Sequence, residues 1–472
     1  MTPPDAPGPA GATLEVEAVA VELGERFQAA GHQLYLVGGR VRDAFLGRRD
    51  PREELDFATD ATPEETVRLL RDWAERKYLQ GVRFGTVGAK KDRHTLEITT
   101  FRKEVYPARD RHPSVSFGTD IGQDLARRDF TVNAMAVRLP EREFVDPFGG
   151  VRDLAARRLE TPVDPEESFG DDPLRMLRAC RFAATLDLVP TARVVTAMRA
   201  MADRLEIVSA ERIQGELTRM LLSDRPSAGL ELAVETGLAE RFVPELTALR
   251  LEQDPVHRHK DVLRHTYAVV EKCEPDLVLR LAALLHDVGK PATRAFTPEG
   301  VQFHHHEVVG ARMADQRLRA LRYPTDVTVQ VVKLVEMHLR FHTYRMGWND
   351  AAVRRYVRDA GSLLDRLNQL VRADCTTRNP FKARALAGLQ DELELRIARL
   401  SEEENLEALR PPLDGNAVMK RLRVGPGPAV GEALRFLLEE RMERGPIAEE
   451  EAYRLLDEWA AARGLPSEPL SS

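Results

Sequence analysis

The chain has 472 residues, of which 43% are hydrophobic and 31% charged, a length and composition typical of a globular protein with several domains. Its three cysteines, Cys180, Cys273 and Cys375, are far apart and form no C-x-x-C motif, which excludes a disulfide framework and a cysteine zinc site and suits the reducing cytoplasm. No apolar run reaches the roughly 20 residues of a membrane span. With a net charge of -7, any nucleic-acid contact must come from a local basic surface.

The first third of the chain alternates between strand and helix patterns. Residues 1–12 lack both the basic and the hydrophobic segment of a signal peptide, so a disordered tail is expected there. The predicted elements are a helix over 14–31, a strand over 32–37, a glycine turn and helix over 38–47, a strand over 51–59, a helix over 62–76 and a hairpin over 84–102. Thr62 is the expected N-cap of the 62–76 helix, with Pro63 at its first position. The hairpin is expected to turn near Asp92.

From Asp172 onward, apolar residues recur at helical spacing and strand patterns nearly disappear. The stretches DPLRMLRACRFAATL, ERIQGELTRMLL and LRLAALLHDVG are examples. We therefore predict an α+β chain: a small α/β unit up to about residue 165, followed by a mostly helical remainder. Clusters of proline, glycine and acidic residues near 162–172, 250–256 and 410–416 mark the expected boundaries.

Two acidic residues in the predicted 51–59 strand form a candidate metal site. Side chains alternate in a strand, so Glu54 and Asp56 point to one face while Leu55 points to the other. An isolated E-x-D of this kind is usually the wet side of an edge strand. Glu97, in LEITTFR, is a candidate third carboxylate, or alternatively an exposed strand residue. Carboxylate pairs of this kind hold Mg²⁺ in sites where substrate phosphates complete the coordination shell.

A glycine turn precedes this strand. Gly38 and Gly39 separate a predicted strand from a helix that carries Arg42. Consecutive glycines at such a junction let backbone N–H groups approach a phosphate, although a bare Gly-Gly turn is more often only a tight connection. The turn and the acidic strand together supply both halves of a nucleotidyl-transfer site.

The motifs LVGGRVRDAFLG, ELDFATDATPEE, LEITTFR, LARRDFTVNAMAV, DPFGGVRDLAARRLE, DDPLRMLRACRFAA and ERIQGEL occur in this order over roughly residues 30 to 225. Together they resemble the motifs of the class II (bacterial and eukaryotic) tRNA nucleotidyltransferases, the CCA-adding enzymes and their poly(A) polymerase relatives. The resemblance implies a polymerase-β-like head followed by an all-α neck, body and tail. It departs from the family at Glu54, where the usual motif has an aspartate. Glutamate has the same charge and one more methylene, so activity is expected to be retained with an altered metal geometry.

The resemblance also implies roles for residues of ARRDFTVNA and of the helix after Asp172. Arg127 and Arg128 would approach the triphosphate, Asp129 would engage the ribose hydroxyl, and Asn133 would help to hold the nucleotide. Asp172 and Arg175 would pair with the Watson–Crick edge of CTP or ATP as an amino-acid template. Asp172 is also the expected N-cap of its helix, with Pro173 at the first position. The remaining residues assigned to nucleotide binding are Gly38, Gly39, Arg42, Arg178 and Arg181.

Histidines gather in the second half of the chain, where a second candidate site is predicted. Imidazole and carboxylate groups from different helices of a bundle bind transition metals or Mg²⁺. The pattern resembles an HD phosphohydrolase domain, with His265, His286, Asp287 and Asp374 at the core metal positions and His306 and His338 extending the set to a second ion. Lys290 could approach a phosphate, whereas His342 is expected to be an ordinary histidine. The alternative is a vestigial HD fold without activity.

The predicted domains are a disordered tail over 1–12, a nucleotidyltransferase head over 13–165, a helical neck that binds tRNA and nucleotide over 166–250, an HD domain over 251–385 and a helical C-terminal tail over 386–472. The expected function is template-independent addition or repair of the 3'-terminal CCA of tRNA from CTP and ATP, with Mg²⁺ in the head and a transition metal or Mg²⁺ in the HD site. A segment of near full length over 101–120, where the family has a flexible loop, favours complete CCA addition. The alternatives are a poly(A) polymerase or A-adding enzyme, and an HD phosphohydrolase whose head only binds RNA. The expected partners are the tRNA acceptor arm, CTP and ATP, with no membrane partner.

Overall fold

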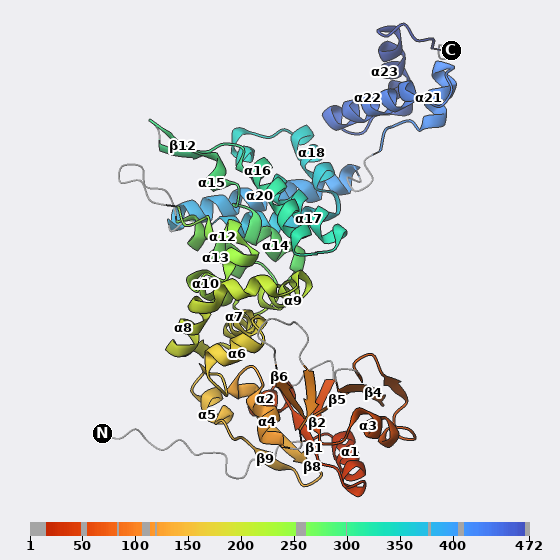
Figure 1. Ribbon diagram of the computed structural model, residues 1–472. Coiled ribbons are helices and arrows are strands. Elements are labelled where there is room, and N and C mark those ends of the chain that lie inside the picture. Colours follow the sequence, from red (N-terminus) through yellow and green to blue (C-terminus); the bar gives the residue numbers. More distant parts are fainter. Residues whose placement is uncertain are drawn as a thin grey trace. The chain divides into compact units, whose positions relative to one another are not determined.

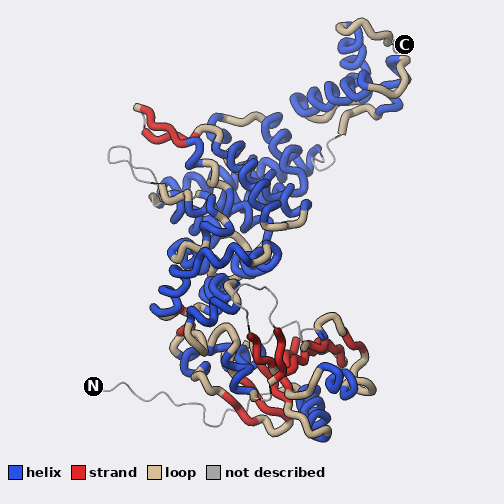
Figure 2. Tube along the Cα trace, viewed as in Figure 1, coloured by secondary structure: helices blue, strands red, loops and turns tan. Residues whose placement is uncertain are grey.

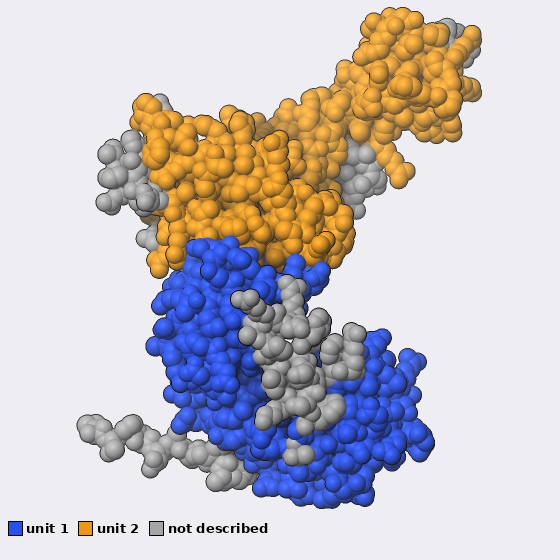
Figure 3. Space-filling model, in the orientation of Figure 1, with its two compact units in different colours: residues 1–220, 228–241 blue, residues 221–227, 242–472 orange. Residues whose placement is uncertain are grey.

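The computed structural model describes residues 16–48, 54–82, 85–105, 114–118, 120–251, 261–298, 300–375, 379–404 and 410–467. The chain divides into two compact units, one formed by residues 1–220 with 228–241 and the other by 221–227 with 242–472 (Figure 3). Strands concentrate in the first unit and helices make up most of the second (Figure 2), which agrees with the predicted α+β class. The predicted tail over 1–12 lies outside the described residues, as do residues 106–113 and 119 of the predicted loop over 101–120.

A mixed sheet of seven strands forms the centre of the head, with the strand order β3-β4-β5-β2-β1-β8-β9 (Figure 1). The bounds of these strands are β1 Leu34–Val37, β2 Glu54–Thr59, β3 Arg76–Tyr78, β4 Thr86–Lys91, β5 His94–Thr100, β8 Ala136–Leu139 and β9 Glu143–Val145. Only the pairing of β2 with β5 is parallel; the other neighbours in this sheet are antiparallel. The central strand β1 is buried along its whole length, because both of its edges are paired and both of its faces are covered.

The helices of the head are α1 Ala18–Ala29, α2 Gly39–Phe45, α3 Pro63–Leu69, α4 Ile121–Ala126 and α5 Gly150–Ala155. Helix α1 buries Leu23 and Phe27 against the sheet in one apolar cluster with Leu34 and Leu55. The remaining short elements of this region are the paired strands β6 Arg102–Val105 and β7 Ser114–Phe117, the 3-10 helix η2 Thr131–Asn133 and strand β10 Arg158–Leu159. The alternation of strands and helices up to residue 165 matches the predicted α/β unit.

The predicted helix over 62–76 is shorter in the structure. Thr62 caps α3 as expected, and it forms a capping box with Glu65. The helix nevertheless ends at Leu69, and Arg76–Tyr78 forms the edge strand β3. The physical reason is tertiary: Trp73 turns inward, is only 8% exposed and donates its indole N–H to Glu22 over 2.7 Å, which breaks the helical register before the chain pairs with β4. The predicted hairpin is confirmed, since Lys91 pairs with His94 across a turn at Asp92.

The next segment is helical, with α6 Pro165–Asp171, α7 Leu174–Leu186, α8 Ala192–Met201, η3 Ala202–Ile207, α9 Ala210–Leu221, α10 Pro226–Glu235 and α11 Ala239–Phe242, and with the two-residue strand β11 Val189–Pro190 beside β10. Helix α7 starts one residue later than predicted. Asp172 nevertheless accepts a hydrogen bond from the backbone N–H of Leu174 over 3.1 Å, so its carboxylate satisfies one donor at the helix start.

The body contains α12 Pro244–Thr247, α13 Val262–Lys272, α14 Leu277–Leu285, α15 Lys290–Thr293, α16 His306–Ala320, α17 Thr325–Met337, η4 Arg340–Met346, α18 Asp350–Ala360, η5 Gly361–Leu363, α19 Leu364–Asp374 and α20 Pro380–Glu404. An antiparallel hairpin, β12 Arg294–Thr297 with β13 Gly300–Phe303, interrupts these helices and was absent from the predicted elements. It connects α15 to α16. Helix α14 is buried on nearly every side, which explains its almost unbroken apolar sequence.

The last three helices, α21 Gly415–Leu422, α22 Pro428–Arg444 and α23 Glu449–Ala461, have an apolar cluster of their own that includes Leu437, Leu456 and Trp459. Across the described ranges of the chain, the helices are all too short or too polar to cross a membrane.

Candidate active sites

The acidic residues of the head meet on one face of the sheet. In the parallel pairing of β2 with β5, Asp56 lies opposite Glu97. Both side chains are exposed, whereas their neighbours Leu55 and Ile98 are buried on the other face. Glu54 is also exposed and two positions before Asp56 on β2. The sheet therefore presents Glu54, Asp56 and Glu97 on a common face. Within the described residues, however, their carboxylate oxygens do not all lie within 4.8 Å of one another.

The glycine turn stands directly beside this face. Gly38 has a φ of 76°, in the region that favours glycine, and forms the junction between β1 and α2. A Cβ atom at this position would lie 3.4 Å from Asp56 Oδ2 and 3.5 Å from Arg128 Nη1. Because glycine has no Cβ, the backbone of Gly38 can lie close to both Asp56 and Arg128.

A cavity of about 400 Å³ runs from the acidic strand to the helices that follow the head. Its charged lining residues are of both signs: Asp56, Glu97, Arg127, Arg128, Asp129, Asp172, Arg175, Arg178 and Arg212. Carboxylates of the sheet lie at one end and arginines of α7 and α9 at the other. A ligand that carries several negative charges and also binds cations fits such a divided surface.

Asp129 is the most constrained acid of the cavity. Its Oδ2 accepts two hydrogen bonds from Arg178, at 2.8 and 2.5 Å, and its Oδ1 accepts from Asn133 Nδ2 and from the backbone of Phe130, both at 2.9 Å. Burial alone would raise the pKa of Asp129, but Arg178 and Asn133 outweigh it and lower the pKa to about 2. Asp129 is therefore an anion at neutral pH, and its position is set by α7.

Asp172 and Arg175 are held separately. Asp172 forms an ion pair with Arg212, whose Nη2 lies 2.7 Å from Oδ2. Arg175 donates to Ser168 Oγ over 2.9 Å and to the backbone carbonyl of Arg127 over 2.6 Å. Both side chains line the cavity, and neither bonds to the other in the contacts observed. The Asp172 carboxylate accepts hydrogen bonds and the Arg175 guanidinium donates them. Because the two groups are held apart, the edge of a nucleobase can fit between them.

Other predicted residues do not line the cavity. Arg42 donates to Asn133 Oδ1 over 2.6 Å, and Arg181 donates to Glu216 Oε2 over 2.5 Å. The Arg181 guanidinium is 4.0 Å from the centre of the Phe182 ring. Gly38, Gly39, Arg42, Asn133, Arg181 and Glu54 are not among the residues that line the cavity.

Arg212 lines the cavity but is missing from the residues predicted as a site. Its motif, ERIQGEL, is visible in the sequence. The 40-residue separation between Arg212 and Asp172 is closed only when α9 packs beside the start of α7. Glu216 of the same motif, 2% exposed, pairs with Arg181 and Arg219, so one helix anchors several arginines.

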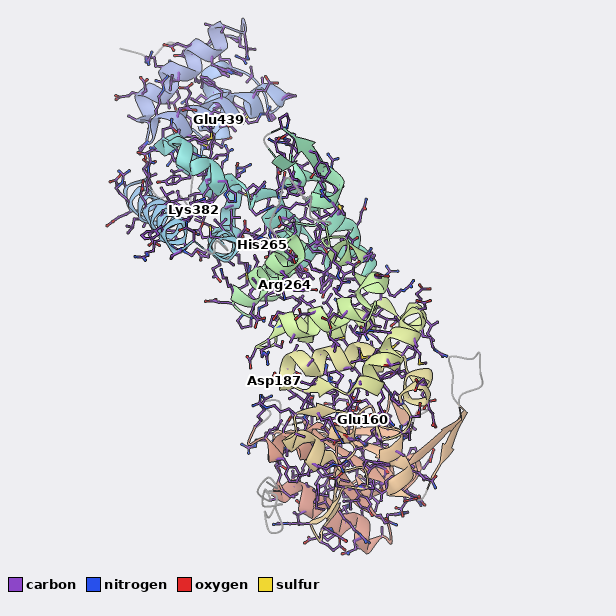
Figure 4. The ribbon with its side chains drawn as sticks, turned by 90° about the vertical axis from the view of Figure 1, so that its left-hand side faces the viewer. Glu160, Asp187, Arg264, His265, Lys382 and Glu439 are labelled. Carbon is purple, nitrogen blue, oxygen red and sulfur yellow. The ribbon has the colours of Figure 1, made fainter. Side chains whose placement is uncertain are left out.

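The histidine site of the body is also brought together by the fold. Two groups of side chains have ligand atoms within 4.8 Å of one another: His265, His286 and Asp374 form one, and Asp287, His306 and His338 form the other. The six residues come from α13, α16 and α19 and from the ends of α14 and α17. Figure 4 marks His265 within this helical part of the chain. Every residue predicted for the HD site is therefore present in it.

Three of the histidines share one orienting contact. The Nδ1 atoms of His286, His306 and His338 each lie 2.7 to 2.8 Å from the carbonyl oxygen of the residue three positions earlier. A carbonyl only accepts, so Nδ1 carries the proton and the lone pair is on Nε2. The Nε2 atoms of His306 and His338 are buried without a hydrogen-bond partner. Buried imidazole lone pairs that converge with carboxylates are the donor set of a metal centre, so the residues fit a pair of metal ions.

The charges in this cluster are strongly coupled. Burial and the nearby His286 lower the pKa of His338 to about 3, so His338 is neutral at physiological pH. Burial would raise the pKa of Asp287, but His286 and other neighbours hold it well below the usual range. For His286, burial lowers the pKa, and Asp287 more than compensates and raises it. The carboxylates of Asp287 and Asp374 thus attract positive charge, whether a proton or a cation.

A cavity of about 270 Å³ opens onto the cluster, with His265, Asp287, His338 and Asp374 in its wall. Lys290 also lines it and bonds Asp287 Oδ2 over 2.6 Å. His342, expected to be an ordinary histidine, is 49% exposed yet lines the cavity with its Nε2 3.7 Å from Asp374 Oδ2. It lies beside the two ligand groups without belonging to either.

Comparison with known protein families assigns the same regions. Residues 34–160 match the poly A polymerase head domain, residues 187–249 match a probable RNA and SrmB-binding site of polymerase A, and residues 262–401 match the HD domain. Among solved structures, the CCA-adding enzyme of Bacillus stearothermophilus in complex with CTP aligns over 95% of this chain and 99% of its own, with a TM-score of 0.70 and 23% identity. That likeness establishes the shared fold.

Two relatives match along almost the whole chain. The A-adding tRNA nucleotidyltransferase of Deinococcus radiodurans is 32% identical over 90% of this chain and 95% of its own length. The CC-adding tRNA nucleotidyltransferase of Thermus thermophilus is 34% identical over 92% of this chain and 96% of its own. The CCA-adding enzyme of Streptococcus suis is 40% identical over 48% of this chain and 55% of its own. With this extent of similarity, the chain belongs to the tRNA nucleotidyltransferase family.

Proposed function

We propose that the protein adds the 3'-terminal C, C and A of tRNA in sequence, from CTP and ATP and without a nucleic-acid template. The observation that carries this proposal is one cavity in which the carboxylates of the sheet face the arginines of the head and the Asp172 and Arg175 pair. In the reaction, the 3' hydroxyl of the RNA attacks the α-phosphate of the nucleotide. A new P–O bond forms there, and the bond to the β-phosphate breaks to release pyrophosphate.

Asp56 and Glu97 would hold Mg²⁺, with Glu54 as a further carboxylate on the same face. When bound, Mg²⁺ lowers the pKa of the attacking hydroxyl and neutralises charge on the leaving group. Arg127 and Arg128 also line the cavity and would bind the triphosphate. Arginine suits this task because its planar group forms paired hydrogen bonds with phosphate oxygens.

Asp129, Asn133 and Arg178 form the part of the site assigned to the ribose. Asp129 already accepts four hydrogen bonds, so a ribose hydroxyl would have to replace one of them, and Arg178 is the partner nearest the cavity. Asp172 and Arg175 would face the base. A carboxylate accepts and a guanidinium donates, so the pair can meet the edge of either cytosine or adenine.

The test is incorporation of labelled CTP and ATP, separately and together, into tRNA transcripts that end before CCA, after C and after CC. Ordered addition of two C and one A, followed by a stop, is the expected result. Addition of C alone or of A alone would show that the enzyme adds only part of CCA. An A tail without limit would show that it is a poly(A) polymerase. Loss of all addition in Asp56→Ala, with the fold retained, would exclude a head that only binds RNA.

A second candidate within the family is an enzyme that adds only CC or only A. It is favoured by one observation, namely that the two relatives matched along almost the whole chain are named for partial addition. The same experiment distinguishes this candidate from the full CCA-adding enzyme. A CC-adding enzyme extends the transcript lacking CCA by two C and leaves the CC-ending transcript unchanged. An A-adding enzyme extends only the CC-ending transcript, by one A.

We further propose that the body carries a metal-dependent phosphohydrolase. The ligand groups His265, His286 and Asp374, and Asp287, His306 and His338, would hold a transition metal or Mg²⁺. When bound, such ions activate a water molecule for attack on a phosphate ester. Lys290, already in the cavity wall, would contact the phosphate. Release of inorganic phosphate or opening of a cyclic phosphate on RNA 3' ends, dependent on added metal and lost in His286→Asn, is expected; a vestigial fold would show neither.

The domain limits that go with this proposal are a head over 13–165, a neck over 166–250, an HD domain over 251–385 and a tail over 386–472. Neck, body and tail would contact the tRNA through its phosphates and shape, since an A-form helix exposes little sequence information. The substrate and the buried, unlinked thiols of Cys180 and Cys273 support a cytoplasmic location.

A further inference from the structure

A buried aspartate outside the metal strand touches both arginines that face the triphosphate. Asp124 lies in the last turn of α4 and is 1% exposed. Its Oδ1 accepts hydrogen bonds from Arg127 Nε over 3.0 Å and from Arg127 Nη2 over 2.6 Å. Its Oδ2 accepts from Arg128 Nη2 over 3.3 Å. A single carboxylate thus binds two adjacent guanidinium groups, one with each oxygen.

The two arginines are the link between Asp124 and the cavity. Both line it, whereas Asp124 does not. Arg128 Nη1 lies against the glycine turn, since a Cβ at Gly38 would be 3.5 Å from it and 3.4 Å from Asp56 Oδ2. Asp124 therefore influences the cavity indirectly, through the side chains of Arg127 and Arg128.

The same short segment also reaches the base side of the cavity. The backbone carbonyl of Arg127 accepts a hydrogen bond from Arg175 over 2.6 Å, and two residues later Asp129 binds Arg178. Residues 124–129 hold the phosphate-facing and base-facing arginines at a fixed spacing. That hydrogen bond uses the backbone of Arg127, so a change in the side-chain contacts of Arg127 leaves the position of Arg175 nearly unchanged.

Electrostatics explain why a buried anion is needed here. Two adjacent guanidinium groups repel each other. Burial opposes the charge on Asp124, but Arg128 and Arg127 outweigh it and keep the pKa of this carboxyl below its usual value. Asp124 stays ionised and offsets the repulsion between the two guanidinium groups.

We propose that Asp124 is a positioning residue that presents Arg127 and Arg128 to the triphosphate of the incoming nucleotide. The inference rests on the proposed nucleotidyl transfer in the head. Asp124 should therefore contribute to recognition of the phosphates and hardly at all to recognition of the base and ribose.

The experiment compares the binding of CTP and CMP to the full chain by titration calorimetry in the presence of Mg²⁺, for wild type and for Asp124→Asn. Asparagine has nearly the same shape but no charge. The preference for CTP over CMP is expected to fall by about tenfold, since charge-assisted hydrogen bonds to both arginines are weakened. The affinity for CMP should change less than twofold, and the Michaelis constant for CTP in tRNA extension should rise with the dissociation constant.

Two further variants control for a merely structural effect. Asp60→Asn removes another head carboxylate that accepts a backbone hydrogen bond, from Gln33 over 2.8 Å, and does not line the cavity. It should leave the CTP to CMP preference unchanged. Asp124→Glu keeps the charge and should give a preference between those of wild type and Asp124→Asn, and it replaces the asparagine variant if that one does not fold.

The outcomes are distinct. If wild type binds CTP no more tightly than CMP and adds no nucleotide, the proposed function fails. If wild type is active and Asp124→Asn lowers CTP and CMP affinity equally, or neither, the role assigned to Asp124 is wrong.

Discussion

Asp56 lies opposite Glu97 because β2 and β5 run parallel and in register. Forty-one positions in the sequence separate these residues, yet both oxygen-bearing side chains project from the same exposed face of the sheet. Rigid strands fix this spacing better than a loop would, and a metal site for phosphoryl chemistry needs such rigidity.

Replacement of Asp56 by asparagine should reduce nucleotide addition by about 10³-fold or more, because a neutral amide is a poor Mg²⁺ ligand and the chemical step depends on the ion. The measurement is single-turnover addition of CMP to a tRNA transcript. Glu54→Gln is the matched comparison: Glu54 is on the same strand face but does not line the cavity, so a loss of no more than about tenfold is expected. Equal losses in the two variants would show that Glu54 is a full ligand.

In the body, His338→Ala should remove one of two bound metal ions. The Nε2 atom of His338 is buried, unpaired within the described structure and part of the group with Asp287 and His306. Metal content of the purified chain, measured by mass spectrometry, is expected to fall by about half, since the group of His265 and its partners remains intact. Addition of CMP to tRNA should be unchanged. Unchanged metal content would contradict the assignment.

Asp129 should make the stability of the head depend on pH. Its folded pKa of about 2 is below the ordinary value of 3.8, so its contribution is fully present above about pH 4 and is lost as the pH falls through 2. The shift corresponds to about 2 kcal/mol of unfolding free energy. Urea unfolding should therefore separate wild type from Asp129→Asn most at pH 7, and by about half as much at pH 3.

Fluorescence of Trp73 reports on the head alone once Trp348 and Trp459, the other two of the three tryptophans, are replaced by phenylalanine in both proteins. If the difference in unfolding free energy between the two proteins is the same at pH 7 and pH 3, the substitution acts through lost packing and not through the charge of Asp129.

Arg280 should be a large contributor to the stability of the body. It is 4% exposed and donates to the backbone carbonyls of Cys273, at 2.9 and 3.1 Å, of Ser223, at 2.5 Å, and of Leu221. Arg280→Met would leave three buried carbonyl groups without this donor, at a cost of about 3 kcal/mol or more. Thermal unfolding provides the measurement. Arg319→Met, which removes an exposed i,i+4 pair with Asp315, should leave the unfolding temperature nearly unchanged.

Binding of tRNA should weaken with salt despite the net charge of -7. Phosphate contacts made by arginine release counterions, so the affinity is expected to fall by about tenfold or more between 50 and 200 mM salt. Filter binding at several salt concentrations measures the slope. An affinity independent of salt would mean that the complex does not depend on phosphate contacts.

The sequence by itself determined most of the elements and the family. The helix cap at Thr62, the two-residue turn at Asp92 and the helical second half follow from local rules of turn residues and apolar spacing. The order of the motifs was enough to predict the family. Local rules failed at Trp73, where burial against the head core ended a helix that the pattern extended to residue 76.

Tertiary structure decided which of the candidate residues meet. Only packing between distant helices brings Arg212 to Asp172, places Arg181 on Glu216 and puts His342 in the wall of the HD cavity. It also sets the tautomers of three histidines through carbonyl groups that the sequence does not mark. Periodicity states which face of a helix is buried, but the partner across that face depends on contacts between segments far apart in the chain, which no local pattern encodes.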